Sequence, residues 1–414
     1  MENKQNNFAK TFGPGLLLAG ISVGTSHLVQ STRAGAGYGL SLVVLIIVAA
    51  LIKYPAFRFG AMYAAATKES ILQGYRRQGK WATPMYVIVA VGTMFAAVPA
   101  VTLFTAGLAQ TVFGLQMETL TVCALILLLS CVMLILGGYA ALDRAIKYVM
   151  VFLVLSTIVA TVFIIPQIDW SSAGSFALPE ITATNILFLA ALVGWMPCSM
   201  DISVWYSLWS IAKSDATGHQ PSVKESLLDF NIGYVGTITL ALCFLLLGLG
   251  AMYGKGLEFA PSAAGFAEQL IGLYTQSLGV WSGPVIGLAA FLVMFSTVLT
   301  GMDGYPRVVV EIAGIFGQRS EIGGRQWYAT SLIVLSLGSF LILTFFVTSL
   351  QVFIDVAATI AFLFGPIIAT LNHRSIFSAH VPEAIQPGYF LRLSSWLGIF
   401  VLTAFALYYL HITY

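Results

Sequence analysis

The stretch SVGTSH at residues 22–27 interrupts an apolar segment that runs from residue 13 to residue 48. A second interruption, GWMPCSMD at residues 194–201, lies inside the apolar segment 186–211. Hydrocarbon offers no water to backbone groups that leave a helix, so an unwound segment at membrane depth must line a polar cavity or bind a ligand. Two interrupted spans at matching places in a chain are typical of a membrane transporter's binding site.

Composition places the chain in a membrane. Apolar residues make up 58% of the 414 and charged residues 9%, and the mean hydropathy is +0.90. A soluble protein of this length could not stay in solution with so few charges, so we expect a polytopic protein of the inner, cytoplasmic membrane. The first ten residues are polar and lead straight into a full apolar span, so no cleavable signal is expected.

The sequence lacks the motifs of common enzymes. It has no P-loop, no metalloprotease motif and no paired-cysteine cluster, so we expect a non-enzyme without a cofactor. Its cysteines lie inside apolar spans, which argues against disulfides and against a zinc site with paired ligands. They are Cys123, Cys131, Cys198 and Cys243. We expect a monomer whose partners are membrane lipid and a transported ion, with no nucleic acid.

Windows of roughly 20 apolar residues mark the membrane spans. They lie at about 13–36, 41–66, 84–110, 118–138, 146–166, 184–211, 230–253, 280–303, 327–347, 350–371 and 390–413. The fold class is therefore an all-α polytopic membrane protein with eleven transmembrane helices. The loops between them are too short for a separate soluble domain.

Positive charge is biased to one side of these spans. With the N-terminus in the cytoplasm, only Lys255 of the nineteen Lys and Arg residues falls in an outer loop, and fifteen fall on the cytoplasmic side. The fifteen are Lys4, Lys10, Lys68, Arg76, Arg77, Lys80, Arg144, Lys147, Lys213, Lys224, Arg307, Arg319, Arg325, Arg374 and Arg392. This bias predicts a cytoplasmic N-terminus and an external C-terminus.

The two interruptions fall in spans one and six, which suggests an internal repeat. Five spans per half is an odd number, so the two halves would insert in opposite orientations. We therefore predict a single transmembrane domain over residues 1–414, made of a first repeat at 1–166, a second, inverted repeat at 184–371, and an extra span at 390–413.

Three short motifs resemble a known family. Gly13-Pro14, the stretch from Ala34 to Leu42 (AGAGYGLSL) and Met196-Pro197 resemble spans one and six of the Nramp family of divalent-metal transporters. The similarity in span count and order extends over nearly the whole chain. This resemblance implies a LeuT-type fold, with a metal ion bound between the unwound parts of spans one and six.

The chain departs from the Nramp pattern at the metal ligands themselves. The family's Asp-Pro-Gly-Asn falls on Gly24-Thr25-Ser26-His27, so both metal-ligating side chains of that motif are replaced. The family's Met falls on Met196, which is kept. The family's His, which lies two residues after that Met, falls on Cys198. A soft thioether remains while the hard carboxylate that would neutralise a dication is gone, which indicates a divergent branch.

The first break supplies four candidate substrate-binding residues, Gly24, Thr25, Ser26 and His27. Polar side chains at mid-membrane are costly unless they face water or a ligand. His27 could act as a neutral imidazole ligand or as a proton acceptor. The alternative is a packing kink, because Gly20 and Gly24 have the spacing of close helix contacts.

The second break supplies Gly194, Met196, Cys198 and Asp201. Pro197 lacks an N–H group, so it opens the helix and frees nearby carbonyls that could serve as ligands. Asp201 is the main acidic candidate, because a carboxylate at that depth is expensive. With His27 and Met196, Asp201 forms the proposed metal-ligand set. Its alternative role is a structural ion pair.

Other charges inside the spans are candidates for ion coupling. Arg33 could pair with Asp201, and the coupling candidates are Asp201, Arg33, Asp355 and Asp303. Lys53 and Arg58 lie on either side of Pro55 in span two and should be paired structurally.

The predicted function is secondary transport of a divalent cation, similar to Mg²⁺ or Mn²⁺, by alternating access. Coupling to protons is left open. A roomier site of hydroxyls, carbonyls and one carboxylate would suit a partly hydrated Mg²⁺. The alternatives are a transporter of a small organic or anionic solute on the same fold, and a sensor that does not transport.

Overall fold

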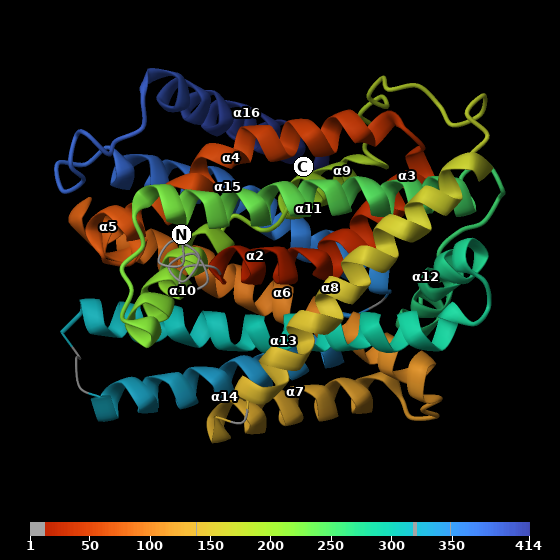
Figure 1. The fold of residues 1–414 in the computed structure, drawn as a ribbon, viewed down its shortest axis with the longest axis horizontal. Helices are drawn as coiled ribbons and strands as arrows, with labels where there is room; N and C mark the ends of the chain where they lie inside the picture. The colour runs from red at the N-terminus through yellow and green to blue at the C-terminus, as the bar shows by residue number, and fades with distance from the viewer. Residues whose placement is uncertain (1–12, 138, 318–320, 348) are drawn as a thin grey trace, which may run out of the picture.

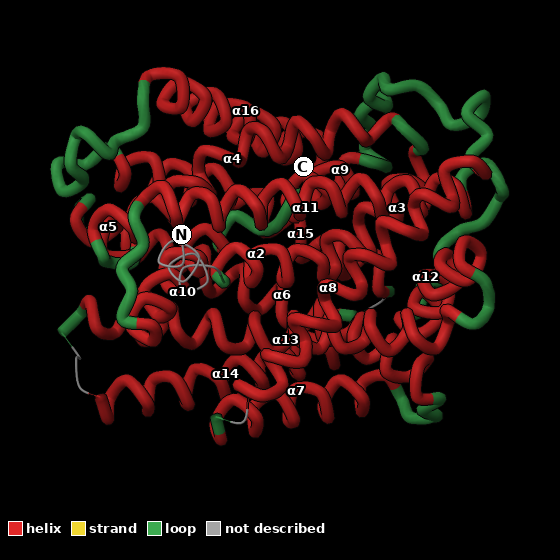
Figure 2. Tube along the Cα trace, in the orientation of Figure 1, coloured by secondary structure: helices red, strands yellow, loops and turns green. Residues whose placement is uncertain are grey.

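The computed structural model describes residues 13–137, 139–317, 321–347 and 349–414. In those ranges the regular secondary structure is helical, joined by loops, with no strand (Figure 2). Nine of the described helices are long and apolar enough to cross a membrane. Two further spans are broken, one near residue 24 and one at residues 196–201. Nine plus two makes eleven, so the predicted all-α polytopic fold is confirmed.

The helices follow one another along the chain in the order shown in Figure 1. They are α2 (Pro14–Ser22), η1 (Val23–Ser31), α3 (Thr32–Tyr38), α4 (Ser41–Thr67), α5 (Ile71–Arg77), α6 (Ala82–Phe113), α7 (Thr119–Leu136), α8 (Tyr139–Ile164), η2 (Ile165–Gln167), α9 (Ile186–Trp195), α10 (Ile202–Thr217), α11 (Val223–Met252), α12 (Ala263–Leu278), α13 (Ser282–Ile315), α14 (Glu321–Phe346), α15 (Leu350–Ile376) and α16 (Tyr389–Thr413).

The long helices divide into an inner and an outer group. At least half of the apolar window is buried in α4, α6, α11, α13 and α15, but no more than a third in α7, α8, α14 and α16. In Figure 1, α7 and α14 lie along one edge of the molecule and α16 lies along the opposite edge. The outer helices expose large apolar side chains such as Leu128, Phe163 and Phe400, so their outward faces are suited to contact lipid.

The broken spans lie among the inner helices and pair in a crossed manner. Span one, formed by α2, η1 and α3, packs along α11, the second span of the other half. In the same way α10 of span six packs against α4, the second span of the first half. This exchange is what an inverted repeat predicts. The repeat boundaries at 1–166 and 184–371 remain predictions.

Glycines allow span one to lie directly against α11. A Cβ at Gly35 would lie 1.8 Å from the Leu245 carbonyl oxygen, and one at Gly248 would lie 2.1 Å from the Thr32 carbonyl oxygen. Backbone therefore meets backbone along this pair, as in other close helix contacts in membranes.

We expect Gly35→Ala to lower the thermal unfolding midpoint of the purified protein, while Gly37→Ala leaves it unchanged or raises it. The added methyl at Gly35 would force the two helices apart, at a typical cost of about 1–3 kcal/mol. Gly37 lies on the same short helix, and a Cβ there has nothing within 4 Å. Equal midpoints for the two variants would contradict the close packing of span one on α11.

Two helices lie in segments that the hydropathy pattern treats as loops. They are α5, with 7 residues, and the 16-residue α12 between α11 and α13. The buried residues of α12 include Phe266, Leu270 and Leu273, which recur at helical spacing. A helix of this length is too short and too polar on one face to register as a span.

The insertion direction across the membrane remains a prediction. Three of the basic residues on which that prediction depends lie outside the described residues. They are Lys4, Lys10 and Arg319.

Candidate functional site

Span one breaks at Gly24. Its ψ of −142° leaves the helical region, and the following turns are wider than an α-helix. Two serine hydroxyls donate hydrogen bonds to backbone carbonyls that precede the break. Ser22 Oγ donates to the Leu18 carbonyl at 2.6 Å, and Ser26 Oγ donates to the Ser22 carbonyl. Such bonds satisfy backbone oxygens locally where the regular ladder is disturbed.

Span six breaks between Trp195, where α9 ends, and Ile202, where α10 begins. Residues 196–201 are not helical. Pro197 has no N–H group to donate to the Val193 carbonyl four residues earlier. The Lys53 ammonium of α4 takes this role and donates to carbonyls of the break.

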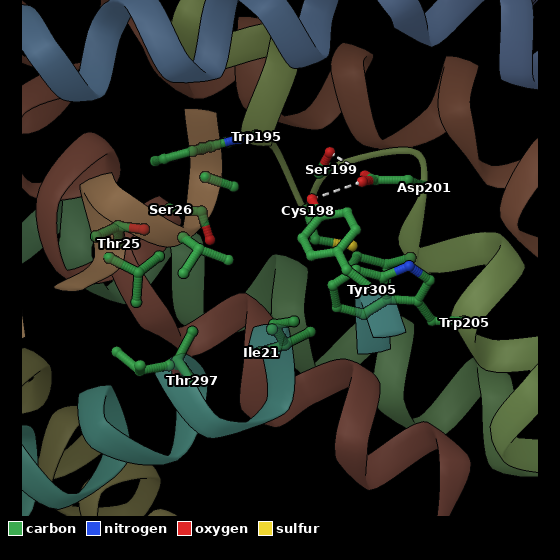
Figure 3. A pocket seen from close by; sticks show the side chains of 16 residues that line it. Ile21, Thr25, Ser26, Trp195, Cys198, Ser199, Asp201, Trp205, Thr297 and Tyr305 are labelled. Atoms are coloured by element: carbon green, nitrogen blue, oxygen red, sulfur yellow. Dashed lines mark hydrogen bonds between the residues drawn. The ribbon is translucent and has the colours of Figure 1, made fainter. Parts of the chain in front are cut away.

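A cavity of about 60 Å³ lies where the two breaks face α6 and α13 (Figure 3). Sixteen residues line the cavity: Ile21, Thr25, Ser26, Ala97, Val98, Val101, Trp195, Cys198, Ser199, Asp201, Ile202, Trp205, Thr297, Val298, Gly301 and Tyr305. Asp201 is the sole charged residue among them.

Asp201 is buried, with 1% of its surface exposed. Its Oδ1 accepts a hydrogen bond from Ser199 Oγ, and its Oδ2 accepts one from the Tyr305 hydroxyl at 3.1 Å. The Tyr305 ring packs edge-on against Trp205, with ring centroids 4.6 Å apart. Two hydroxyls thus orient a carboxylate beside an aromatic wall, as Figure 3 shows.

Trp205 carries an unsatisfied polar atom in this wall. Its side chain is 2% exposed, and its Nε1 has no hydrogen-bond partner among the described residues. A buried N–H group without an acceptor is rare in folded proteins, and each case calls for an explanation. A ligand in the cavity that accepts this hydrogen bond would provide one.

Four of the predicted binding residues line the cavity together: Thr25, Ser26, Cys198 and Asp201. They come from both breaks, as the inverted repeat predicts.

The two glycines predicted as binding residues, Gly24 and Gly194, do not line the cavity and lie against neighbouring helices instead. A Cβ at Gly24 would lie 2.9 Å from Thr297 Cγ2, so this position faces a side chain of the cavity wall. A Cβ at Gly194 would lie 2.2 Å from the Ala358 carbonyl oxygen, so this glycine permits close contact between α9 and α15.

The three predicted metal ligands do not meet in the cavity. His27 points to α11, where its Nε2 lies 2.7 Å from the Thr237 carbonyl oxygen. Met196 Sδ accepts a hydrogen bond from Ser31 Oγ at 3.4 Å, and neither His27 nor Met196 lines the cavity. Asp201 alone of the set does. Within the described ranges no group of three or more His, Cys, Asp and Glu residues could hold a metal ion.

Arg33 pairs with Asp355 of α15, and not with Asp201 as the sequence suggested. Its two terminal nitrogens lie 2.7 and 2.9 Å from the carboxylate oxygens, and its guanidinium lies 4.7 Å from the centre of the Phe188 ring. Gln30 bridges the pair by donating to Asp355 at 2.8 Å. The suggested partner was wrong because α3 continues beyond the break and meets the start of α15, whereas Asp201 stays at the cavity.

The remaining intramembrane charges lie away from the cavity lining. Asp303 accepts hydrogen bonds from Arg307 at 2.6 Å and from the Tyr328 hydroxyl at 2.7 Å. Arg58 donates to the Tyr54 hydroxyl at 2.8 Å.

Several lining residues were not anticipated from the sequence. Thr297, Gly301 and Tyr305 recur every four residues, so they form one face of α13. This polar and small-residue spacing within an apolar helix is the signal that could have found them. Trp195 and Trp205 flank the second break, but aromatic residues in a membrane helix are ordinarily packing residues.

Comparison with known proteins identifies one close relative. No protein-family model matches the chain. It is 33% identical over 404 residues to the uncharacterized protein PM0681 of Pasteurella multocida. The match covers 95% of this chain and 90% of that protein.

Solved structures share the fold at low identity. The manganese transporter of Eremococcus coleocola, in complex with an aromatic bis-isothiourea substituted compound, matches with a TM-score of 0.69 and 15% identity, over 98% of this chain and 86% of that one. Mhp1, a nucleobase-cation-symport-1 family transporter with bromovinylhydantoin bound, matches with a TM-score of 0.58 and 13% identity, over 98% and 94%.

At these identities the structural matches establish the fold, which is the LeuT type expected from the Nramp resemblance. The sequence match extends along nearly the whole of both chains. This multi-pass membrane protein of LeuT-type fold therefore belongs to the same family as PM0681 of Pasteurella multocida.

Proposed function

We propose that this protein is a secondary transporter that carries a small organic solute by alternating access to the cavity between its two broken spans. The observation that carries the proposal is that Trp205, whose buried N–H group has no hydrogen-bond partner among the described residues, lines the same cavity as Asp201. One group offers a hydrogen bond and the other accepts one. A solute with its own donors and acceptors satisfies both.

Charge favours an organic solute over a metal ion. The cavity lining carries the single negative charge of Asp201, and the positive charge of Lys53 lies close behind the second break. The two charges sum to zero, so a dication would enter a site with no net negative charge to balance its own. Burying an uncompensated charge is strongly unfavourable.

The shape of the lining points the same way. Trp195, Trp205 and Tyr305 present aromatic surface to the cavity, while Thr25, Ser26 and Thr297 add hydroxyls. Aromatic faces pack well against flat or cationic organic groups. The fold itself accommodates such ligands, because the Mhp1 structure holds bromovinylhydantoin.

A divalent cation is the second candidate substrate. It is favoured by the Nramp resemblance, by the fold shared with a manganese transporter, and by the buried Asp201 carboxylate beside the Ser199 hydroxyl. Oxygen ligands of this kind are preferred by Mg²⁺ and Mn²⁺. Coupling to protons and the inner-membrane location remain part of the proposal.

Binding and uptake experiments separate the candidates. Purified protein is titrated calorimetrically with Mg²⁺, Mn²⁺ and a panel of amino acids and cyclic amides, and each ligand that binds is tested for uptake into proteoliposomes. We expect an organic ligand to bind. Stoichiometric binding of Mg²⁺ or Mn²⁺, with no organic ligand bound, would favour the metal candidate. Binding without uptake of any ligand would favour a sensor.

We expect Trp205→Phe to weaken binding of that organic ligand about 5- to 30-fold, the effect of one lost hydrogen bond of about 1–2 kcal/mol. The phenyl ring keeps an aromatic face but lacks the N–H group. Trp281→Phe makes the same chemical change at a residue that is 71% exposed, and should leave binding unchanged. Equal affinities for both variants would remove the indole N–H from ligand recognition.

A further inference from the structure

The Lys53 side chain ends inside a ring of backbone oxygens. Its Nζ lies 2.8 Å from the carbonyl oxygens of Val193 and Gly194, 2.9 Å from that of Met196 and 3.1 Å from that of Cys198. The residue is 2% exposed, although it belongs to a different span from the four carbonyls. An ammonium group has three hydrogens to donate, and here it is surrounded by four acceptors, one more than it has hydrogens.

The ring exists because α9 stops at Trp195. The last carbonyls of a helix lack intrahelical donors, and the aligned peptide dipoles place partial negative charge at that end. Pro197 removes the donor that would have bonded to Val193, and the non-helical segment that follows turns two more carbonyls inward. In a membrane interior these oxygens need a positive partner.

We propose that this ring is a coordination site for a monovalent cation of about the size of K⁺ or NH₄⁺, in which the Lys53 ammonium is the resident cation. Backbone carbonyls can replace the hydration shell of such an ion, as they do in potassium-selective filters. The oxygens stand 2.8–3.1 Å from Nζ. Mg²⁺ and Ca²⁺ require about 2.0–2.6 Å, so the ring as built is too wide for them.

The site has a positioning role. The segment held by Lys53 carries Cys198, Ser199 and Asp201 to the cavity. The hydrogen bonds that Lys53 makes in the described part of the chain all go to backbone carbonyls of this segment. The occupied ring therefore sets the geometry of the break, whatever the substrate.

The test is to vacate the ring and supply a free cation. Lys53→Ala and Lys53→Ser are purified in KCl, and thermal unfolding is then followed in choline, Na⁺, K⁺ and NH₄⁺ chlorides at equal ionic strength. Choline is too large for the ring. We expect both variants to unfold at a lower temperature in choline and to recover in K⁺ or NH₄⁺. The midpoint should rise with the logarithm of cation concentration, by on the order of 3 °C at about 100 times the dissociation constant.

Three controls accompany this test. The wild-type midpoint should not depend on the cation, because the ring is already filled. Lys53→Met fills the volume without charge, so it should be destabilised in every salt and not rescued. Arg58→Ala removes a positive charge from the same helix and should behave like the wild type.

The proposal requires rescue by a small monovalent cation. It is overturned if the Ala and Ser variants unfold at the same temperature in all four salts, or if both fail to fold in KCl. Because the readout is unfolding, the result is independent of which substrate the cavity binds.

Discussion

Asp201→Asn is expected to reduce transport by on the order of 100-fold while the protein remains folded. A hydrogen bond to a buried charged group contributes about 1.5–3 kcal/mol, and the amide cannot supply the negative charge. The substitution keeps the shape of the side chain and can still bond to Ser199 and the Tyr305 hydroxyl. The loss should occur for an organic solute and for a metal ion alike, because Asp201 is the one charged residue among the described residues that line the cavity.

The measurement is uptake into proteoliposomes, with thermal unfolding recorded on the same preparations. Asp303→Asn is the matched control, since that carboxylate bonds to Arg307 and Tyr328 and does not line the cavity. It should retain most of the uptake, and a large loss would restore its predicted coupling role. Wild-type uptake by Asp201→Asn would exclude its charge from the mechanism.

Asp355→Ala is expected to destabilise the protein by about 3–5 kcal/mol, because it leaves Arg33 charged and unpaired in a largely buried site. The side chains of Arg33 and Asp355 are 15% and 8% exposed, so water can compensate only in part. The Gln30 side chain would keep its contact with Arg33 at 3.0 Å but cannot neutralise it.

A double-mutant cycle separates a stranded charge from lost packing. Thermal unfolding is compared for Asp355→Ala, Arg33→Met and the two combined. If the charge is the cause, the double variant should be more stable than Asp355→Ala alone. Strictly additive losses would mean that the two residues do not depend on each other, contrary to their observed contact.

The spans and the position of the candidate site could be predicted from the sequence. Apolar windows of membrane length identify helices because their backbone hydrogen bonds are local, so no tertiary information is needed. The breaks at 22–27 and 194–201 were recognisable because polar residues, Gly and Pro at membrane depth are costly without a purpose. Thr25 and Asp201 were found in this way, and both line the cavity.

Which way a side chain turns at a break could not be predicted. His27 follows directly on two residues that line the cavity, yet its ring faces the Thr237 carbonyl on α11. The turns around Gly24 are wider than an α-helix, so the usual helical spacing no longer gives the direction of each side chain. The amphipathic helix α12 was not predicted from hydropathy. It is short and apolar on one face only, so its average hydropathy is close to that of a loop.

By itself, the sequence of this protein determined the number of spans, the places where two of them unwind, and the presence of costly charges within them. Only the tertiary structure decided which groups those charges meet. Arg33 and Asp355 are 322 positions apart, and Lys53 reaches carbonyls about 140 positions away, through contacts between helices of different halves. Helix formation depends on neighbours in the chain, whereas an ion pair or a filled carbonyl ring depends on how whole helices pack, which hydropathy does not encode.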